Sequence, residues 1–390
     1  MITTTYVSDY AARNRQFLEE RRNAIAEVTI AEVRAVRGED AVPQAIVETP
    51  SVLYSFYIND TEMFYNEVGF SISEFDHLFD LSAGCFIFSG RGRKPQISQK
   101  DVLILLLHFF RRYPKLEEMG AAYGMTASKL SKILDKAIQA AYERYVPLFI
   151  NRPAEVLDLP TDANVPECGY IVDATVQRIL TPTGTFDQKK QWFSGKHGCY
   201  CLKSQVITDM KGAAIMVNSG YMGSIHDMRI FRETINEWHR IAILHPIIPQ
   251  KILADKGYQA NDINVLITPV KGSPERLSRQ ENAFNERIGK SRIVVENFFG
   301  RVKNRYSIIG SVFRHSHEMY PKIFTLCCAF TNFEIRLCGH GLREEDGDWY
   351  SKFYTSDIEA MKNRALDQQE RRKRTRERRR IRIQELSQNE

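Results

Sequence analysis

Two acidic residues lie in apolar segments, where a carboxylate is costly. Asp173 lies within Tyr170–Thr175, and Asp255 directly follows Ile252–Ala254 and precedes a glycine turn. A buried carboxylate is destabilising unless it is paired or binds a metal ion. Both segments have the composition of strands, and α/β sheets present their ligands at strand ends. The two acids are therefore candidate metal ligands.

Two further acids extend this set. Asp227 lies at an expected loop-to-helix junction, where a helix N-cap is an equally good interpretation. Glu296 lies on an expected helix from about Phe284 to Arg305. At 100° per residue, Arg292, Glu296 and Lys303 fall within about 40° of one another on that helix. The two cations are suited to bind phosphate oxygens. The glutamate lies at the edge of the apolar stripe of the helix, from which its side chain can reach into a cleft.

The chemistry that such a set can perform is phosphodiester cleavage. Mg²⁺ prefers carboxylate oxygens, and Mn²⁺ suits the same ligands. Two such ions roughly 4 Å apart activate a water molecule and stabilise the leaving oxygen. Three or four carboxylates suffice if the fold brings them together, which spacing alone does not establish.

The elements that would position these acids form a predicted α/β domain at residues 160–340. Strands are expected at residues 169–180, 199–208, 213–221, 251–254 and 265–270, before the long helix and a mostly helical region to about residue 337. Strands first and an acid on a late helix is the order of the RNase H-like fold. We therefore expect a mixed sheet in an RNase H-like catalytic domain.

An all-α region is predicted at residues 51–150, with a helix from Ser98. Within it, Leu116–Ile133 reads as a short helix, a glycine turn, a threonine N-cap and a second helix, which is the plan of a helix-turn-helix. Lys129 and Lys132 would face outward and contact DNA. A three-helix bundle with no DNA contact is the alternative.

Two basic segments stand out, one within the helical region and one at the end of the chain. Arg91 and Arg93 lie in a Gly-Arg link at 90–95, which resembles minor-groove hooks but is equally well explained as a charged hinge. The net charge of +6 is concentrated at the end of the chain. Residues 362–382 carry eleven Lys/Arg against three Asp/Glu, a local +8, so the rest of the chain carries −2. We expect this basic tail, residues 360–390, to serve nuclear import, DNA attraction or both.

The remaining composition narrows the class of protein. A hydrophobic content of 43% with 22 Phe and 17 Tyr is typical of a folded chain, and no apolar run approaches the length of a membrane span. Residues 1–50 read as a polar helical or flexible extension with no chemistry. Seven Cys without a regular frame favour reduced, buried thiols; a zinc site pairing Cys199 and Cys201 with Cys338 and His340 is a poor match in spacing.

Taken together, the motifs around the four acids resemble a known family. Ile171–Thr175, Gly223–Asp227, Leu253–Tyr258 and Arg292–Lys303 resemble the PIF/Harbinger transposases and the nuclease-like proteins derived from them. The Arg-x3-Glu-x6-Lys part is shared with bacterial cut-and-paste transposases, but Gly289 stands where the bacterial motif has Tyr.

The resemblance implies a catalytic DDE triad of Asp173, Asp255 and Glu296, with Asp227 as a fourth metal-site acid. It also implies Mg²⁺ or Mn²⁺ as cofactor and terminal inverted repeats of double-stranded DNA as substrate. Nuclear residence, homo-oligomers on DNA and a Myb-like partner protein follow from the same resemblance. Two alternatives stay open: a domesticated DNA-binding regulator, and a nuclease that no longer moves DNA.

Overall fold

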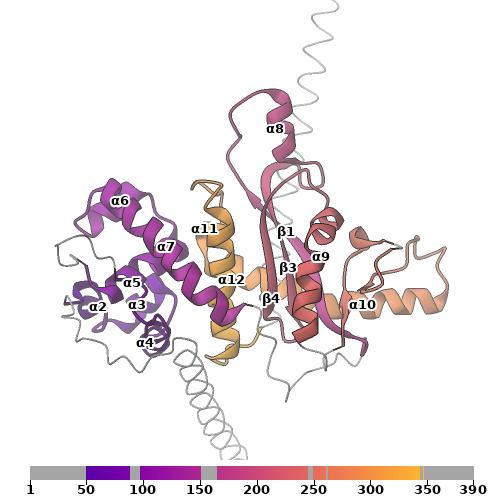
Figure 1. Ribbon diagram of the computed structural model, residues 1–390, viewed down its shortest axis with the longest axis horizontal. Coiled ribbons are helices and arrows are strands. Elements are labelled where there is room, and N and C mark those ends of the chain that lie inside the picture. Colours follow the sequence, from indigo (N-terminus) through magenta and orange to yellow (C-terminus); the bar gives the residue numbers. More distant parts are fainter. Residues whose placement is uncertain are drawn as a thin grey trace, which may run out of the picture.

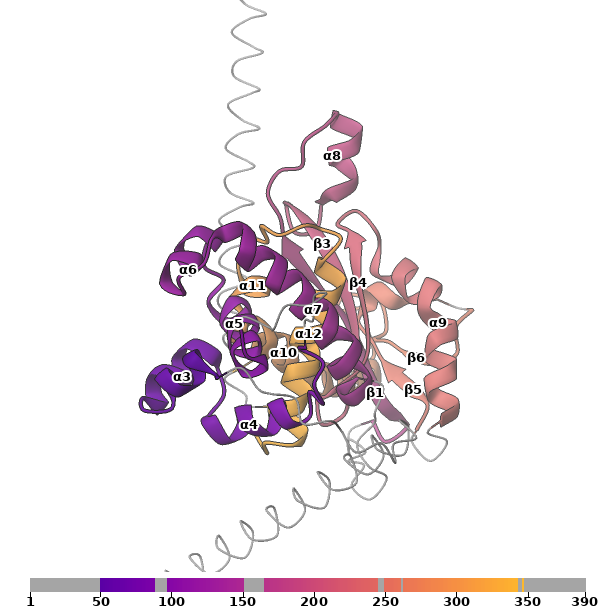
Figure 2. The same cartoon turned by 60° about the vertical axis from the view of Figure 1, so that its left-hand side comes forward.

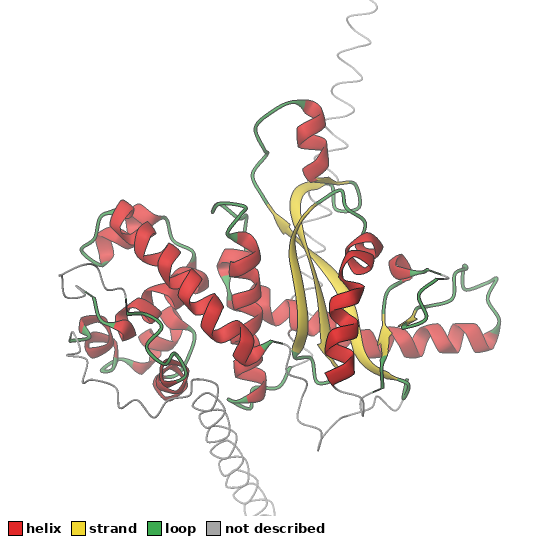
Figure 3. Ribbon diagram, in the orientation of Figure 1, coloured by secondary structure: helices red, strands yellow, loops and turns green. Residues whose placement is uncertain are grey.

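The chain folds into an all-helical part and a part built on a mixed sheet. The computed structural model describes residues 50–87, 97–150, 165–244, 249–260, 262–342 and 346. In Figure 1 the helical part is indigo to violet and lies to one side of the strands, and Figure 3 shows the same division by element type. The N-terminal extension, the Gly-Arg link with Arg91 and Arg93, and the basic tail lie outside the described residues.

The helical part is organised around one apolar helix. Its members are α2 (Val52–Tyr57), α3 (Thr61–Val68), α4 (Ile72–Asp80), α5 (Gln99–Arg112), α6 (Leu116–Ala122) and α7 (Ala127–Phe149). The apolar run of α5 is buried almost throughout, which is why this helix forms the centre. Asp101 in its first turn is buried and accepts the backbone N–H groups of Val52, Leu53 and Tyr54 at 2.9–3.1 Å. One carboxylate thereby caps α2 and ties it to α5.

The segment with helix-turn-helix composition contains the expected local features. Gly124 follows α6 with a positive φ of 63°, a conformation that favours glycine. The Thr126 hydroxyl then accepts the backbone N–H of Lys129 at 3.3 Å and starts α7. The Lys129 and Lys132 residues are both exposed on α7.

The sheet has six strands, antiparallel on one side of β1 and parallel on the other. They are β1 (Cys168–Arg178), β2 (Phe193–Ser194), β3 (Cys199–Asp209), β4 (Ala214–Met222), β5 (Lys251–Leu253) and β6 (Leu266–Ile267). The order is β2-β3-β1-β5-β6, with β4 paired to β3. β3 pairs antiparallel with β1 and β4, whereas β5 pairs parallel with β1 and β6. The expected mixed sheet is confirmed, with β1 at its centre.

Helices cover both faces of this sheet. α9 (Asp227–Leu244) packs on β3 and β4, and its buried Trp238 stacks edge-on against Tyr170 at 4.6 Å between ring centroids. α10 (Arg279–Arg305), α11 (Ser307–Gly310) and α12 (Tyr320–Arg336) belong to the other, larger core. Figure 2 shows α9 beside β5 and β6, away from α12 and the helical part. A 3₁₀ turn, η2 (Lys256–Tyr258), follows β5. Between β1 and β2 in the chain, α8 (Phe186–Trp192) projects from the sheet (Figure 1).

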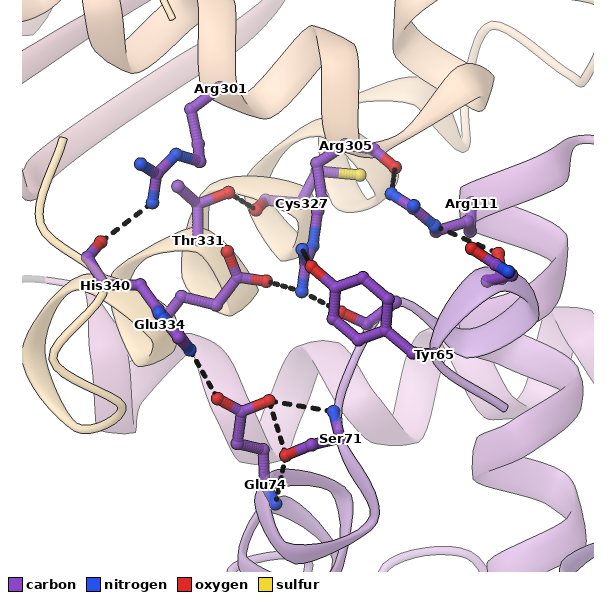
Figure 4. Close-up of polar contacts among 12 residues, drawn as sticks. Tyr65, Ser71, Glu74, Arg111, Arg301, Arg305, Cys327, Thr331, Glu334 and His340 are labelled. Atoms are coloured by element: carbon purple, nitrogen blue, oxygen red, sulfur yellow. Dashed lines mark hydrogen bonds and ion pairs between the residues drawn. The ribbon is translucent and has the colours of Figure 1, made fainter. Parts of the chain in front are cut away.

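The two parts share one core and a polar joint. α12 packs between α7 and β4, so its side chains are buried nearly all round. At the end of α10, Arg305 forms an ion pair with the buried Glu334 of α12 and contacts Gly69 and Tyr65 of the helical part (Figure 4). Arg111 of α5 donates in turn to the Arg305 carbonyl at 3.2 Å. The last turn of α10 is therefore anchored to the helical part.

Two details of the elements differ from expectation. α10 begins at Arg279, five residues before the expected start, because Ser278 and Glu281 form a reciprocal capping box. β6 spans only Leu266–Ile267 of the expected 265–270. Among the described residues, no helix has the length and apolar character needed to cross a membrane.

Candidate active site

Parallel pairing of β1 and β5 brings the two strand acids together. Ile171 is paired with Leu253, and each is followed two residues later by an acid, Asp173 and Asp255. The backbone N–H of Ala174 donates to Asp173 Oδ1 at 2.8 Å and orients that carboxylate. The two acids therefore lie side by side where β5 ends.

α10 crosses β1 and adds the third acid together with a cation. The Arg292 guanidinium lies 3.2 Å from Asp173 Oδ2, 3.4 Å from Asp255 Oδ1 and 4.0 Å from Glu296 Oε1. Asp173 and Arg292 are the more enclosed, with side chains 22% and 14% exposed, whereas Asp255 and Glu296 are 38% and 45% exposed. Three carboxylates from three elements thus surround one guanidinium at the margin of the domain.

The electrostatics of this group centre on Asp173. Burial raises the pKa of Asp173 from 3.8 to about 6, the Arg292 charge lowers it, and Asp255 and Glu296 raise it again. Like charges held close together disfavour ionisation unless a cation offsets them. Arg292 supplies one positive charge for three carboxylates, so the site has an excess of negative charge.

The donor types suit a hard divalent cation, but their present spacing does not. Within the residues that the structure describes, no three His, Cys, Asp or Glu side chains stand close enough together to hold a metal ion. Carboxylate oxygens are the ligands that Mg²⁺ and Mn²⁺ prefer. The guanidinium of Arg292 lies in the space that these oxygens would otherwise share.

The segment that carries these acids has relatives of known class. Residues 172–332 match the family described as DDE superfamily endonuclease. We call these residues, which are similar to that family, the endonuclease segment. It includes all four acids singled out from the sequence, together with Arg292 and Lys303.

Individual relatives agree with that assignment. The chain is 26% identical over 249 residues to "Probable transposase for insertion sequence element IS702" of Microchaete diplosiphon, which is 63% of this chain and 84% of the relative. It is 22% and 21% identical over 322 residues to "Putative nuclease HARBI1" of Bos taurus and Homo sapiens, 77% of this chain and 88% of each relative. No solved structure matches the chain. An insertion-sequence relative thus exists although Gly289 departs from the bacterial motif.

Asp227, the fourth acid of the endonuclease segment, has its own cation. Lys203 Nζ of β3 lies 2.9 Å from Asp227 Oδ1 and donates to the Ile225 carbonyl at 2.6 Å. The Gln205 amide donates to the Asp227 carbonyl and to the Tyr258 hydroxyl, which connects the start of α9 to η2. Asp227 is the first residue of α9, and its place as a fourth metal-site acid stays a prediction.

Lys303, which also belongs to the endonuclease segment, is buried. It shares a face of α10 with Arg292, but its Nζ donates to the Val176 carbonyl of β1 at 2.8 Å. Burial lowers the pKa of Lys303 from 10.5 to about 7, and nearby Cys201 and Cys199 oppose that shift. Lys303 is 7% exposed in this arrangement, and its expected DNA contact stays a prediction.

The other sequence-based candidates divide between surface and core. Lys129 and Lys132 are exposed on α7, away from the acids in sequence and element. Cys199 and Cys201 are buried, which agrees with the expected apolar thiols. The residue that sequence reasoning missed is Lys203. Its signal was a lone lysine within the apolar strand 199–208, because such a lysine needs an acidic or carbonyl partner.

Proposed function

We propose that this protein is a divalent-metal-dependent DNA endonuclease of the DDE type that cuts phosphodiester bonds at transposon ends. The observation that supports it is the gathering of Asp173, Asp255 and Glu296 around one cation, in a segment of the endonuclease family. These three carboxylates are the proposed catalytic ligands, and Asp227 is the proposed fourth metal-site acid. An ion held there would activate water and stabilise the leaving oxygen.

The strand order supports an RNase H-like assignment for this domain. Three antiparallel strands, β4, β3 and β1, are followed by the parallel strands β5 and β6. The acids then come from the central strand, from the end of its parallel neighbour and from a late helix. Rigid elements at three corners would hold the carboxylates in place while the reacting phosphate is positioned.

The proposed DNA path extends beyond the acids. Lys129 and Lys132 of α7 would contact the duplex, as would Arg91 and Arg93 of the Gly-Arg link. The basic tail would concentrate the protein on nucleic acid or direct it to the nucleus. Terminal inverted repeats as substrate, homo-oligomers on DNA and a Myb-like partner belong to the same proposal and rest on the family resemblance.

The direct test is strand cleavage by the full chain with DNA that contains the sequences flanking its own gene. Asp173→Asn keeps the shape of the side chain but removes its charge, so we expect loss of Mg²⁺- or Mn²⁺-dependent cleavage with DNA binding retained. Asp262→Asn is the matched control, because Asp262 is 66% exposed and pairs at 2.8 Å with Arg232 on the surface. Equal loss of binding and cleavage in Asp173→Asn would indicate a folding role and refute the proposed site.

The same assay separates the alternative functions. Cleavage followed by joining of the cut end to a second duplex identifies a transposase. Cleavage without joining identifies a nuclease that no longer moves DNA. Tight, sequence-specific binding without cleavage in either metal identifies a DNA-binding regulator.

A further inference from the structure

Arg292 is held differently from the other enclosed cations of the sheet domain. Its guanidinium meets three carboxylates at 3.2, 3.4 and 4.0 Å and forms no fork with any single one. Strong arginine–carboxylate pairs are bidentate, at about 2.7–2.9 Å. Arg292 Nε, like Arg305 Nε, is buried and has no hydrogen-bond partner among the described residues, so the sharing of its guanidinium is what sets Arg292 apart. The guanidinium is therefore shared and incompletely satisfied.

Lys203, in the same domain, is a cation held by close contacts and serves as the comparison for Arg292. Its amine has one carboxylate partner at 2.9 Å and one carbonyl partner at 2.6 Å, and its side chain is 8% exposed. Arg292 also borders the two most exposed acids of its group, Asp255 and Glu296, so its end lies near solvent. Its position allows withdrawal, whereas that of Lys203 does not.

A divalent ion and this guanidinium cannot use the same oxygens at once. Mg²⁺ needs its oxygen ligands at about 2.0–2.1 Å in a near-octahedral arrangement, which requires the carboxylates to close in. Two cations in one site also repel each other. Entry of the ion therefore requires Arg292 to leave the carboxylates and find another anion.

We propose that Arg292 is a resident, exchangeable cation of the acidic site, and that it leaves its carboxylates for a phosphate oxygen of DNA when the divalent ion binds. This inference rests on the proposed function, since it takes DNA as the substrate and these acids as the metal ligands. Guanidinium groups bind phosphate in the same forked manner as carboxylate. DNA and metal ion then bind cooperatively, because each favours the arrangement that the other needs.

The test measures Mn²⁺ binding to the full chain by electron paramagnetic resonance of free Mn²⁺, with and without a short DNA duplex. Without DNA, Arg292→Gln should bind Mn²⁺ more tightly than the wild type, by about ten-fold within the usual range of couplings. The duplex should tighten Mn²⁺ binding in the wild type and change it little in Arg292→Gln. Arg287→Gln is the matched control on α10, since its guanidinium lies over the Phe284 ring at 5.8 Å; it should behave as the wild type.

Arg292→Met repeats the experiment with an apolar side chain that replaces only the aliphatic stem, and thermal melting shows whether each variant folds. Mn²⁺ should raise the melting temperature of both variants more than that of the wild type, because three carboxylates then lack their cation. Unchanged or weaker Mn²⁺ binding in both variants, with Asp173→Asn losing it, would overturn the exchange and leave the proposed function standing. Mn²⁺ binding that Asp173→Asn does not affect would overturn the acids as ligands, and with them the proposed function.

Discussion

Replacing Lys303 by Met distinguishes two roles for this residue, a buried structural role and a DNA-binding role. Its amine donates to the Val176 carbonyl, and the residue is only 7% exposed. A lysine that contacts phosphate stabilises a complex, whereas a buried lysine imposes a cost on the folded protein whenever it is charged. The two roles predict opposite results, so one variant distinguishes them.

The cost follows from the shift in the pKa of Lys303, from 10.5 to about 7. Each unit corresponds to about 1.4 kcal/mol, so the charged amine destabilises the fold by about 5 kcal/mol below pH 7. In the unfolded chain the proton is held up to pH 10.5. Unfolding therefore takes up a proton between pH 7 and 10.5, and wild-type stability rises with pH in that window.

Methionine removes this cost but leaves the Val176 carbonyl without its donor, which costs about 1–3 kcal/mol. We therefore expect Lys303→Met to be about 2–4 kcal/mol more stable than the wild type near pH 6. Near pH 9 only about 2 kcal/mol of the original cost remains, so the two proteins should then be about equal.

Urea denaturation at several pH values between 6 and 9 measures this difference. Lys290→Met is the control, because Lys290 is an exposed cation of the same helix, paired with Glu286 at 2.9 Å; its effect should be small and independent of pH. The salt dependence of DNA binding should be unchanged in Lys303→Met, whereas loss of a phosphate contact lowers the slope by about one. A constant stability difference across pH, or a lower slope, would refute the buried role.

Three further predictions test the joint, the helical part and the tail. Arg305→Met leaves a buried carboxylate without its cation and should lower the free energy of unfolding by about 3–5 kcal/mol. The surface variant Arg232→Met should lower it by at most about 1 kcal/mol. Equal losses in the two variants would show that the polar joint does not stabilise the fold. Lys129→Gln and Lys132→Gln should each reduce the salt slope of DNA binding by about one unit, and an unchanged slope would make their helix purely structural. Deleting residues 361–390 should abolish nuclear accumulation, weaken DNA binding, or both. If the truncated protein still accumulates in the nucleus and binds DNA normally, the tail is only a solubilising extension.

Local patterns predicted the long strands and the long helix well, because each depends on its own residues. A composition rich in strand-forming residues marked β1, β3 and β4 to within about two residues. Sequence patterns did not indicate α8, and only the start of α9 was anticipated. The pairing of the strands could not be predicted either. β5 and β6 have only three and two residues, and packing between distant segments decides their place on the β1 side of the sheet.

The sequence marked the three acids that meet Arg292, but it did not indicate which partner each cation contacts. Asp173, Asp255 and Glu296 are unusual within their own segments, so the sequence marks them. The spacing on α10 correctly placed Arg292 and Lys303 on one face, but the wheel does not show which strand that face meets. Over this length the face crosses β1 from Asp173 to Val176, so Arg292 meets a carboxylate and Lys303 meets a carbonyl.

The enclosed cations of the domain thus fall into two kinds. Lys303 and Arg305 each contact a buried partner and Lys203 contacts a half-buried one, and the distances from the two lysine amines to their partners are 2.6–2.9 Å. Lys203 and Arg305 each neutralise a carboxylate, so removing either cation leaves that acid without its counter-charge. Arg292 alone among these four is spread over three acids at 3.2–4.0 Å, two of which face solvent. Exchange of partners is least costly there, and that is where the proposed metal binding requires a cation to move.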